Sequence, residues 1–250
     1  MTIALITGGS RGLGRSAALH LARNGVGIVL TYQSNAAAAE EVVAAIRAEG
    51  GKAVALPLDT GRVGTFRAFA ETLAGALRQH WGSATFDILM NNAGHGVHRS
   101  FAETSEEEFD GLMAVHLKGV FFLTQTLLPM IADGGRILNV STGLARFSLP
   151  GYAAYATMKG GVEVLTRYLA KELGPRRIAV NTIAPGATET DFGGGAVRDV
   201  PDVNRMVAET TAMGRAGRPD DIGAAVAALL APGTGWMTAQ RIEVSGGQNL

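Results

Sequence analysis

The chain has 250 residues, of which 47% are hydrophobic and 18% are charged, so it can fill a sizeable core and does not have the composition of a disordered chain. Lys and Arg number 22, as do Asp and Glu, and the resulting zero net charge gives no support for a nucleic acid or a membrane as the partner. The absence of cysteine excludes disulfides, thiol catalysis and zinc–thiolate sites, and no His and carboxylate set has metal-ligand spacing. Without a signal-peptide pattern or about 18 uninterrupted apolar residues, we expect a cytoplasmic protein with no membrane span.

Short apolar runs alternate with longer helical patterns. Strands are expected at 3–7, 26–32, 52–59, 86–94, 134–142, 178–186 and 240–247, and helices at 14–25, 35–51, 63–82, 105–131 and 152–174. Strands rich in Val, Ile and Leu that are separated by helices predict a doubly wound, Rossmann-type α/β fold, with a parallel seven-stranded sheet and helices on both faces. We expect one domain over 1–250, in which the irregular segment 188–217 is either a substrate lid or a surface excursion.

The first expected strand runs into a glycine-rich turn, Thr7-Gly8-Gly9-Ser10-Arg11-Gly12-Leu13-Gly14. Glycines let the backbone turn tightly and approach a ligand, and the free N–H groups of the following helix favour a pyrophosphate. The spacing departs from G-x-G-x-x-G, so the turn alone is also compatible with a purely structural role.

The end of the second expected strand carries no acid. An NAD site usually has an acid there for the ribose 2′-hydroxyl. This chain instead has Tyr32, Gln33 and Ser34, which would tolerate a 2′-phosphate, and Arg11 is placed to meet that phosphate. NADP is therefore favoured as the cofactor, and NAD is less favoured.

Tyr155 and Lys159 are four positions apart, which makes them neighbours if their segment is helical. An ammonium beside a phenol lowers the tyrosine pKa from about 10, and such a phenol can exchange protons near neutral pH. The alternative is a surface tyrosine beside a solvated lysine.

Four features together resemble the short-chain dehydrogenase/reductase family over essentially the whole chain: the turn at 7–14, Asn91-Asn92-Ala93-Gly94, the Tyr155/Lys159 pair and Pro185-Gly186. The resemblance implies an NADP(H)-dependent oxidoreductase that interconverts a small-molecule ketone or aldehyde and its alcohol by hydride transfer. It makes Tyr155 the general acid/base, and Lys159 the residue that holds the nicotinamide ribose and lowers the tyrosine pKa. It also implies a homotetramer or homodimer built on the two long helices.

The resemblance assigns the cofactor-binding positions as well. They are Gly8, Ser10, Arg11, Gly12, Leu13 and Gly14 in the turn; Tyr32, Gln33 and Ser34; Asp59 and Thr60 near the adenine; Asn91, Ala93 and Gly94 along the adenine ribose; Pro185, Gly186 and Thr188 at the nicotinamide; and Thr190 near the phosphates.

Two positions depart from the family pattern. The catalytic hydroxyl, usually a serine thirteen residues before the tyrosine, is here Thr142, with Ser141 beside it. We assign the role to Thr142 because it occupies the position that the family's spacing gives, and because adjacent residues near a strand end point to opposite sides, so that only one of the two hydroxyls can face the site. His116 stands where the family has an asparagine that supports a water relay to the lysine, so it either donates to that relay or packs within the helix.

Two other functions remain open. The first is a 3-oxoacyl-carrier-protein reductase, which would need basic residues for its acidic carrier; Asp133 is acidic, although Lys171 could bind the carrier. The second is a non-catalytic NADP-binding sensor on the same fold, and the presence of both Tyr155 and Lys159 argues against it. By the family's layout, a mixed apolar pocket with one cation is expected from Arg146, Phe147, Tyr152, Phe192 and Met213. His95 and His98 either line its mouth or face solvent.

Overall fold

The computed structural model describes residues 1–250 and contains one sheet of seven parallel strands in the order β3-β2-β1-β4-β5-β6-β7. The strands are β1 (Ile3–Ile6), β2 (Gly27–Tyr32), β3 (Ala53–Pro57), β4 (Phe86–Asn91), β5 (Ile131–Val140), β6 (Ala179–Pro185) and β7 (Arg241–Val244). Every residue of β1 and β6 is buried, as expected for strands that are covered on both faces. The predicted doubly wound α/β fold is confirmed.

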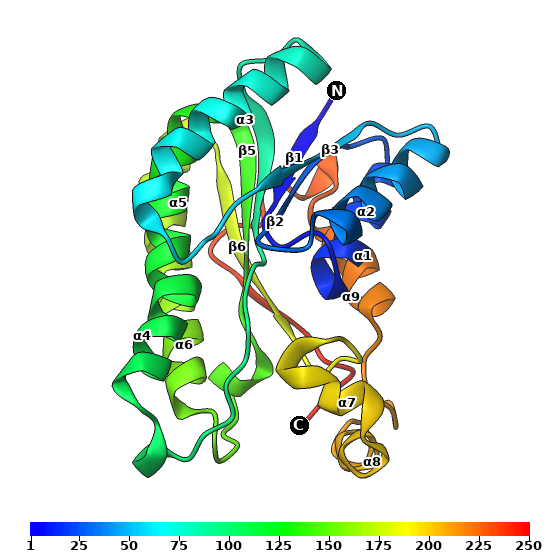
Figure 1. Cartoon of the computed structure of the whole chain (residues 1–250), viewed down its shortest axis with the longest axis vertical. Coiled ribbons are helices and arrows are strands. Elements are labelled where there is room, and N and C mark those ends of the chain that lie inside the picture. The colour runs from blue at the N-terminus through cyan, green and yellow to red at the C-terminus, as the bar shows by residue number, and fades with distance from the viewer.

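Helices form a layer on each side of this sheet (Figure 1). One layer contains α1 (Gly12–Arg23), α2 (Ala36–Ala48) and α9 (Pro219–Leu229), and the other contains α3 (Phe66–Trp81), α5 (Gly119–Leu127) and α6 (Ala153–Glu172). Leu21, Val42 and Val226 belong to the core on the first side, and Phe66 and Leu123 to the core on the second. Because each helix presents one apolar stripe to the sheet, the two cores hold the carboxyl ends of the strands in fixed relative positions.

The helix expected at 105–131 is divided into several pieces. A capping box between Ser105 and Glu108 starts α4 (Glu106–Met113), a wider π-helical turn follows at Ala114–Lys118, and α5 continues from it. A 3-10 turn then ends at Met130, so β5 begins three residues earlier than expected. By length and composition the run 106–130 could cross a membrane, but in this fold it contributes a core helix. The π-helical turn contains His116, and such turns are frequent at functional sites.

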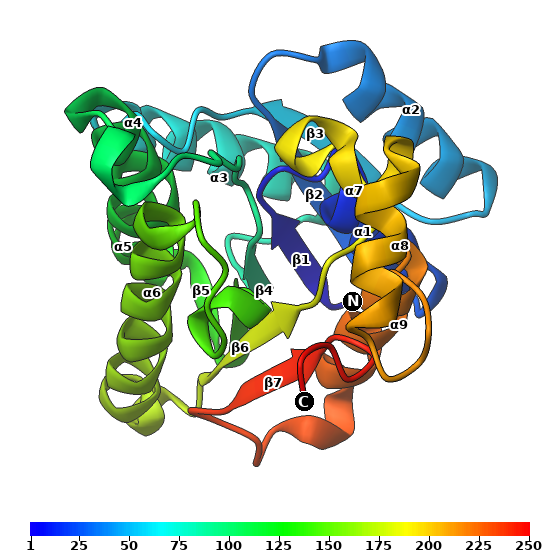
Figure 2. The same cartoon turned by 90° about the horizontal axis from the view of Figure 1, so that it is seen from below.

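The strand order reverses between β1 and β4, whose carboxyl ends therefore flank a crevice of the type that binds ligands in such sheets. The segment expected as a lid lies near this end and contains α7 (Ala196–Asp199) and α8 (Pro201–Glu209) (Figure 2). Its far end pairs with the C-terminal segment, because the N–H of Met213 donates to Gly246 O at 3.0 Å and that of Asn249 to Thr210 O at 2.8 Å. The C-terminal segment thus anchors the expected lid.

Candidate active site

The glycine-rich turn and the Asn-Asn-Ala-Gly turn are tied together at this crevice. Thr7 Oγ1 accepts hydrogen bonds from the N–H of Asn92 at 2.9 Å and of Ala93 at 3.0 Å. Asn92 Nδ2 donates to the carbonyl oxygens of Thr7 and Gly8 at 2.9 and 3.0 Å. Gly8 has a φ of 64°, and a Cβ there would lie 2.9 Å from Cα of Ala93, so only glycine fits. Both turns are therefore held as one unit.

Helix α1 begins directly after the glycine-rich turn, and no side chain caps its first backbone N–H groups. Arg11 is the N-cap residue, has an extended backbone and makes no side-chain capping bond. Its side chain is exposed, and Thr190 lies across the turn, with its Cγ2 3.6 Å from where a Cβ on Gly12 would be. Uncapped N–H groups, the helix dipole and a free guanidinium fit the pyrophosphate and the 2′-phosphate of NADP.

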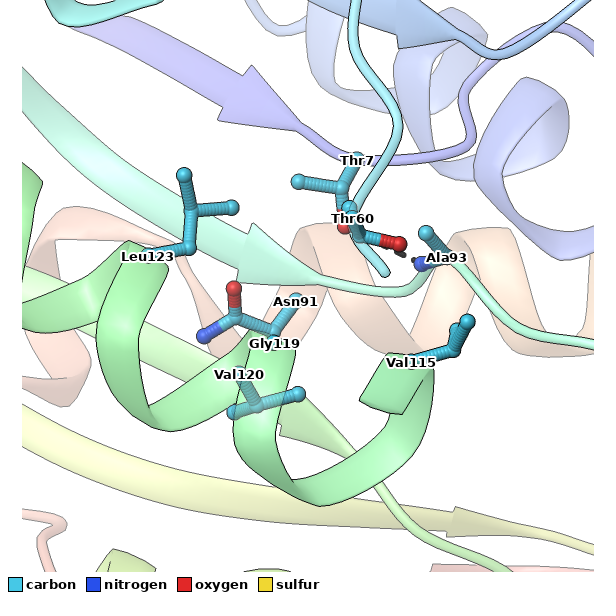
Figure 3. A pocket seen from close by; sticks show the side chains of 8 residues that line it. All are labelled: Thr7, Thr60, Asn91, Ala93, Val115, Gly119, Val120 and Leu123. Atoms are coloured by element: carbon cyan, nitrogen blue, oxygen red, sulfur yellow. Dashed lines mark hydrogen bonds between the residues drawn. The ribbon is translucent and has the colours of Figure 1, made fainter. Parts of the chain in front are cut away.

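The remaining adenosine-side positions lie along the carboxyl edge of the sheet. Gln33 and Ser34 are exposed beyond β2, and Asp59 Oδ1 accepts the N–H of Gly61 at 2.9 Å. Thr60 and Ala93 line a cavity of about 10 Å³, which is the size of about one water molecule (Figure 3).

The side chain of Asn91 is bound within the core. Its buried Nδ2 donates to Thr124 Oγ1 at 3.1 Å and to Asn139 Oδ1 at 2.8 Å. The amide group therefore connects β4, β5 and α5 and supports the turn from behind, and Asn91 lines the same cavity as Thr60 and Ala93.

Tyr155 and Lys159 lie in the first two turns of α6, as their spacing predicts, and are only 6% and 4% exposed. Lys159 Nζ donates to Val140 O at 2.7 Å and lies 5.7 Å from the centre of the Tyr155 ring. Burial lowers the pKa of Lys159 to about 8.

The predicted lowering of the tyrosine pKa is wrong for the protein without a bound cofactor. Burial raises the pKa of Tyr155 above its ordinary value, and a hydrogen bond from Thr142 offsets this only in part. The largest cause is desolvation, because burial disfavours the charged phenolate. Tyr155 is therefore a protonated phenol over the physiological pH range.

The hydroxyls of Ser141 and Thr142 point to opposite sides, as strand alternation predicts. Ser141 Oγ donates to Glu163 Oε1 at 2.6 Å and is buried. Thr142 Oγ1 accepts the N–H of Leu144 at 3.2 Å, and the hydroxyl lies close enough to the Tyr155 phenol to act toward a lower pKa of that group. Only the Thr142 hydroxyl faces Tyr155.

His116 is buried against the same tyrosine, with its ring perpendicular to the Tyr155 ring and the centres 5.1 Å apart. Its Nε2 lies 2.7 Å from His95 O and 3.3 Å from His95 N, and we assign the hydrogen to Nε2 because the contact to the carbonyl, which only accepts, is the shorter of the two. Burial and the charge of Lys159 lower the pKa of His116 to about 2, so the ring is neutral and the buried, unpartnered Nδ1 is an acceptor. With the hydrogen on Nε2, His116 would take part in the expected relay as an acceptor through Nδ1.

Two aromatic rings pack against the Tyr155 ring: the His116 ring and the Phe192 ring, whose centre lies 5.6 Å from that of Tyr155. His95 packs against His116 at 5.4 Å and His98 against Tyr152 at 4.9 Å, and both histidines are exposed to solvent.

Arg146, the cation expected in the substrate pocket, is already paired with a carboxylate. Arg146 is bound to both carboxylate oxygens of Glu243 at 2.7 and 2.8 Å and to the carbonyl oxygens of Gln248 and Asn249. Met213 is 72% exposed and packs beside Gly246.

Three residues of this region were not found from the sequence: Glu163, Arg241 and Gln248. Glu163 lies four residues after Lys159, so helical spacing would have placed it on the catalytic face of α6. Arg241 donates to Glu163 Oε1 at 2.8 Å, and Gln248 Oε1 accepts the N–H of Ala187 at 2.9 Å behind the Pro185-Gly186 turn. These last two contacts come from distant parts of the chain and have no local sequence signal.

Known proteins share this arrangement. A family model described as Enoyl-(Acyl carrier protein) reductase matches residues 8–249. The chain is 36% identical over 257 aligned positions to the hydroxynaphthalene reductase-like protein Arp2 of Metarhizium brunneum, covering 98% of this chain and 94% of that protein. The promiscuous reductase LugOII, which catalyses keto-reduction at C1 during lugdunomycin biosynthesis, has a TM-score of 0.94 at 39% identity, with 100% of this chain and 98% of that chain covered.

The angucycline C-6 ketoreductase LanV with bound NADP also has a TM-score of 0.94, at 36% identity, with 99% and 95% of the two chains covered. A second structure of LanV contains NADP and rabelomycin. A match over nearly the whole length, together with the tyrosine, lysine and hydroxyl at the carboxyl edge of the sheet, establishes that the chain belongs to the short-chain dehydrogenase/reductase family and is an oxidoreductase.

Proposed function

We propose that this protein is an NADPH-dependent ketoreductase that converts a ketone into a secondary alcohol. The observation that carries the proposal is the buried Tyr155 phenol, which lies beside the Thr142 hydroxyl and has the buried ammonium of Lys159 5.7 Å from its ring centre. Reduction of a ketone requires a hydride at carbon and a proton at oxygen, and NADPH supplies the hydride when it is bound.

Residues of this chain would supply the proton that the ketone oxygen receives. Tyr155 donates it to the substrate oxygen, and the raised pKa keeps the phenol protonated until then. Thr142 donates a hydrogen bond to the oxygen as negative charge develops on it. The ammonium of Lys159 stabilises the phenolate that remains, and since Val140 O takes only one of its hydrogens, the others are free to hold ribose hydroxyls.

The preference for NADPH rests on the charges at the turn. Arg11 is an exposed cation at the N-terminus of α1, and Gln33 and Ser34 beyond β2 offer no carboxylate that would repel a 2′-phosphate. The NADP found in LanV, a relative with the same fold, supports this choice.

The rings around Tyr155 support a flat aromatic ketone as the substrate class. Phe192 packs beside Tyr155 and is 42% exposed, so it presents apolar ring surface next to the phenol, and Arg146 is paired with Glu243. The names of the relatives agree with this class, since they refer to hydroxynaphthalene, angucycline and rabelomycin.

A spectrophotometric assay tests the proposal. The protein is given NADPH or NADH with a tetralone-type ketone, an aliphatic ketone, or an acetoacetyl group on an acyl carrier protein. We expect the fastest oxidation with NADPH and the aromatic ketone. Faster turnover of the carrier-bound substrate would instead assign a 3-oxoacyl-carrier-protein reductase, and cofactor binding without any turnover would assign a sensor.

The variant Tyr155→Phe removes only the phenolic hydroxyl. Turnover should fall by about two orders of magnitude or more, while NADPH binding, followed by its fluorescence, stays unchanged. Near wild-type turnover in this variant would end the assignment of Tyr155 as proton donor.

We also propose a homo-oligomer built on the outer faces of α5 and α6. Phe121, Val164 and Tyr168 are exposed apolar or aromatic residues on these helices. Light scattering of the purified protein should give a mass of two or four chains, and a monomer at micromolar concentration would contradict this.

A further inference from the structure

We propose that Arg241 and Glu163 are positioning residues that hold the Ser141–Thr142 turn in the geometry that the reaction needs. The inference rests on the proposed function, because it assigns these residues to the placement of the Thr142 hydroxyl beside Tyr155. Neither residue touches the reacting atoms, so they act through Thr142.

Arg241 is the centre of the arrangement. From the start of β7 its three guanidinium nitrogens donate to three different acceptors: Nε to Glu163 Oε1 at 2.8 Å, Nη1 to Glu243 Oε2 at 2.8 Å and Nη2 to the carbonyl oxygen of Thr142 at 3.0 Å. The planar fork of an arginine fixes three such acceptors in one plane. The backbone of Thr142 is thereby tied to β7 and, through Glu163, to α6.

Glu163 supplies the second attachment. It lies eight residues after Tyr155, on the same face of α6, and its Oε1 accepts from Ser141 Oγ at 2.6 Å as well as from Arg241. The residue before Thr142 is thus bound to the helix that carries the tyrosine. Charge-assisted hydrogen bonds of this length are about twice as strong as neutral ones.

The hydrogen bonds of Arg241 and Glu163 are largely shielded from solvent. The side chains of Glu163 and Arg241 are only 14% and 25% exposed, and Glu243 pairs with Arg146 as well as Arg241, so two cations face two anions. Such a partly buried, balanced network is costly to disrupt, because each charge would lose its partner without regaining full hydration. The turn is therefore fixed from β7, α6 and the C-terminal segment.

Position matters more for Thr142 than for an ordinary turn residue. Its hydroxyl must meet both the substrate oxygen and Tyr155, and a displacement of about 1 Å in a catalytic group can cost about a hundredfold in rate. Without Arg241 the Thr142 carbonyl loses its side-chain partner, and the turn is held only by the Ser141–Glu163 bond and local backbone bonds. We therefore expect turnover to depend on Arg241.

The test is a double-mutant cycle between Arg241→Ala and Thr142→Val, measured as kcat at saturating NADPH and ketone. Arg241→Ala alone should lower kcat by about tenfold to a hundredfold, with NADPH affinity within about twofold of wild type. In the Thr142→Val background the same change should alter kcat by less than about twofold, because the hydroxyl that it positions is already gone. A purely structural role would not produce this loss of effect.

Arg176→Ala is the matched control. Arg176 also binds a carboxylate and backbone carbonyls, Asp133 at 2.7 Å and Leu128 O at 2.9 Å, but at the opposite end of β5 from Thr142. It should lower the melting temperature without changing kcat. If Arg241→Ala does not fold, Arg241→Lys replaces it in the same cycle, because an ammonium keeps the charge but lacks the planar fork; its kcat should lie between those of wild type and Thr142→Val.

The outcomes separate the two claims. If Thr142→Val itself keeps wild-type turnover, the assignment of Thr142 in the proposed function fails. If Thr142→Val is slow but the Arg241 variant either keeps wild-type kcat or loses the same factor in both backgrounds, the positioning role is refuted and the proposed function stands.

Discussion

Replacing Thr142 by valine removes one hydroxyl and keeps the shape of the side chain. In the structure that hydroxyl lies beside the Tyr155 phenol and accepts the N–H of Leu144 at 3.2 Å. Loss of the bond to Leu144 leaves a helix-start N–H without its cap and should cost about 1 kcal/mol of folding free energy. Loss of a donor to a developing oxyanion costs about 2.7–4 kcal/mol, so kcat should fall by a factor of about 10²–10³.

Two companion variants make this prediction specific. Thr142→Ser keeps the donor and should retain most of the activity. Ser141→Ala removes a hydroxyl that is already bound to Glu163 at 2.6 Å, so kcat should fall by less than about tenfold while stability drops by about 1.5–3 kcal/mol. The assay is the turnover number at saturating NADPH, with thermal unfolding measured on the same samples. If Ser141→Ala is the slower variant, the assignment of the two hydroxyls must be exchanged.

Three further results are expected. Arg11→Ala should weaken NADPH binding by about one to two decades and leave NADH nearly unchanged, since a charge-assisted bond to phosphate contributes about 1.5–3 kcal/mol; tighter binding of NADH than NADPH by the unmodified protein in a fluorescence titration would refute this. Ketone reduction should be level at low pH and decline above a pH of about 8, because burial lowers the pKa of Lys159 to about 8 and its ammonium is present only below that value; a rate that rises through this range would contradict the role of the charge. His116→Phe, which keeps a ring but has no acceptor nitrogen, should lower kcat about tenfold more than His116→Asn, and equal rates would make His116 a packing residue.

The sequence predicted those features that depend on local pattern. Strands such as Ile3–Ile6 and Gly27–Tyr32 are buried almost throughout, so their apolar runs, separated by helical patterns, were sufficient to predict a parallel sheet. The four-residue spacing of Tyr155 and Lys159 requires only one helical turn, and the opposite orientation of Ser141 and Thr142 follows from strand geometry.

Other features depend on burial and on distant contacts. Spacing alone placed an ammonium beside the phenol but did not reveal that both are desolvated, which reverses the direction of the tyrosine pKa. Likewise, nothing near Arg241 in the sequence indicates that it binds Thr142 across the sheet edge. The pairing of Arg146 with Glu243 was hidden for the same reason, because 97 residues separate them.

The way in which Tyr155 recovers its proton is restricted by the same buried groups. Each reduction would consume the phenolic proton, and a donor must restore it before the next turnover. His116 cannot donate from Nε2 without breaking its 2.7 Å bond to His95 O, and its Nδ1 accepts. Lys159 is the buried cation beside the tyrosine, with a pKa lowered to about 8, so its ammonium is acidic enough to protonate the phenolate. We therefore propose that the lysine that would stabilise the phenolate would also reprotonate it, which would tie the decline in reduction above pH 8 to a single group.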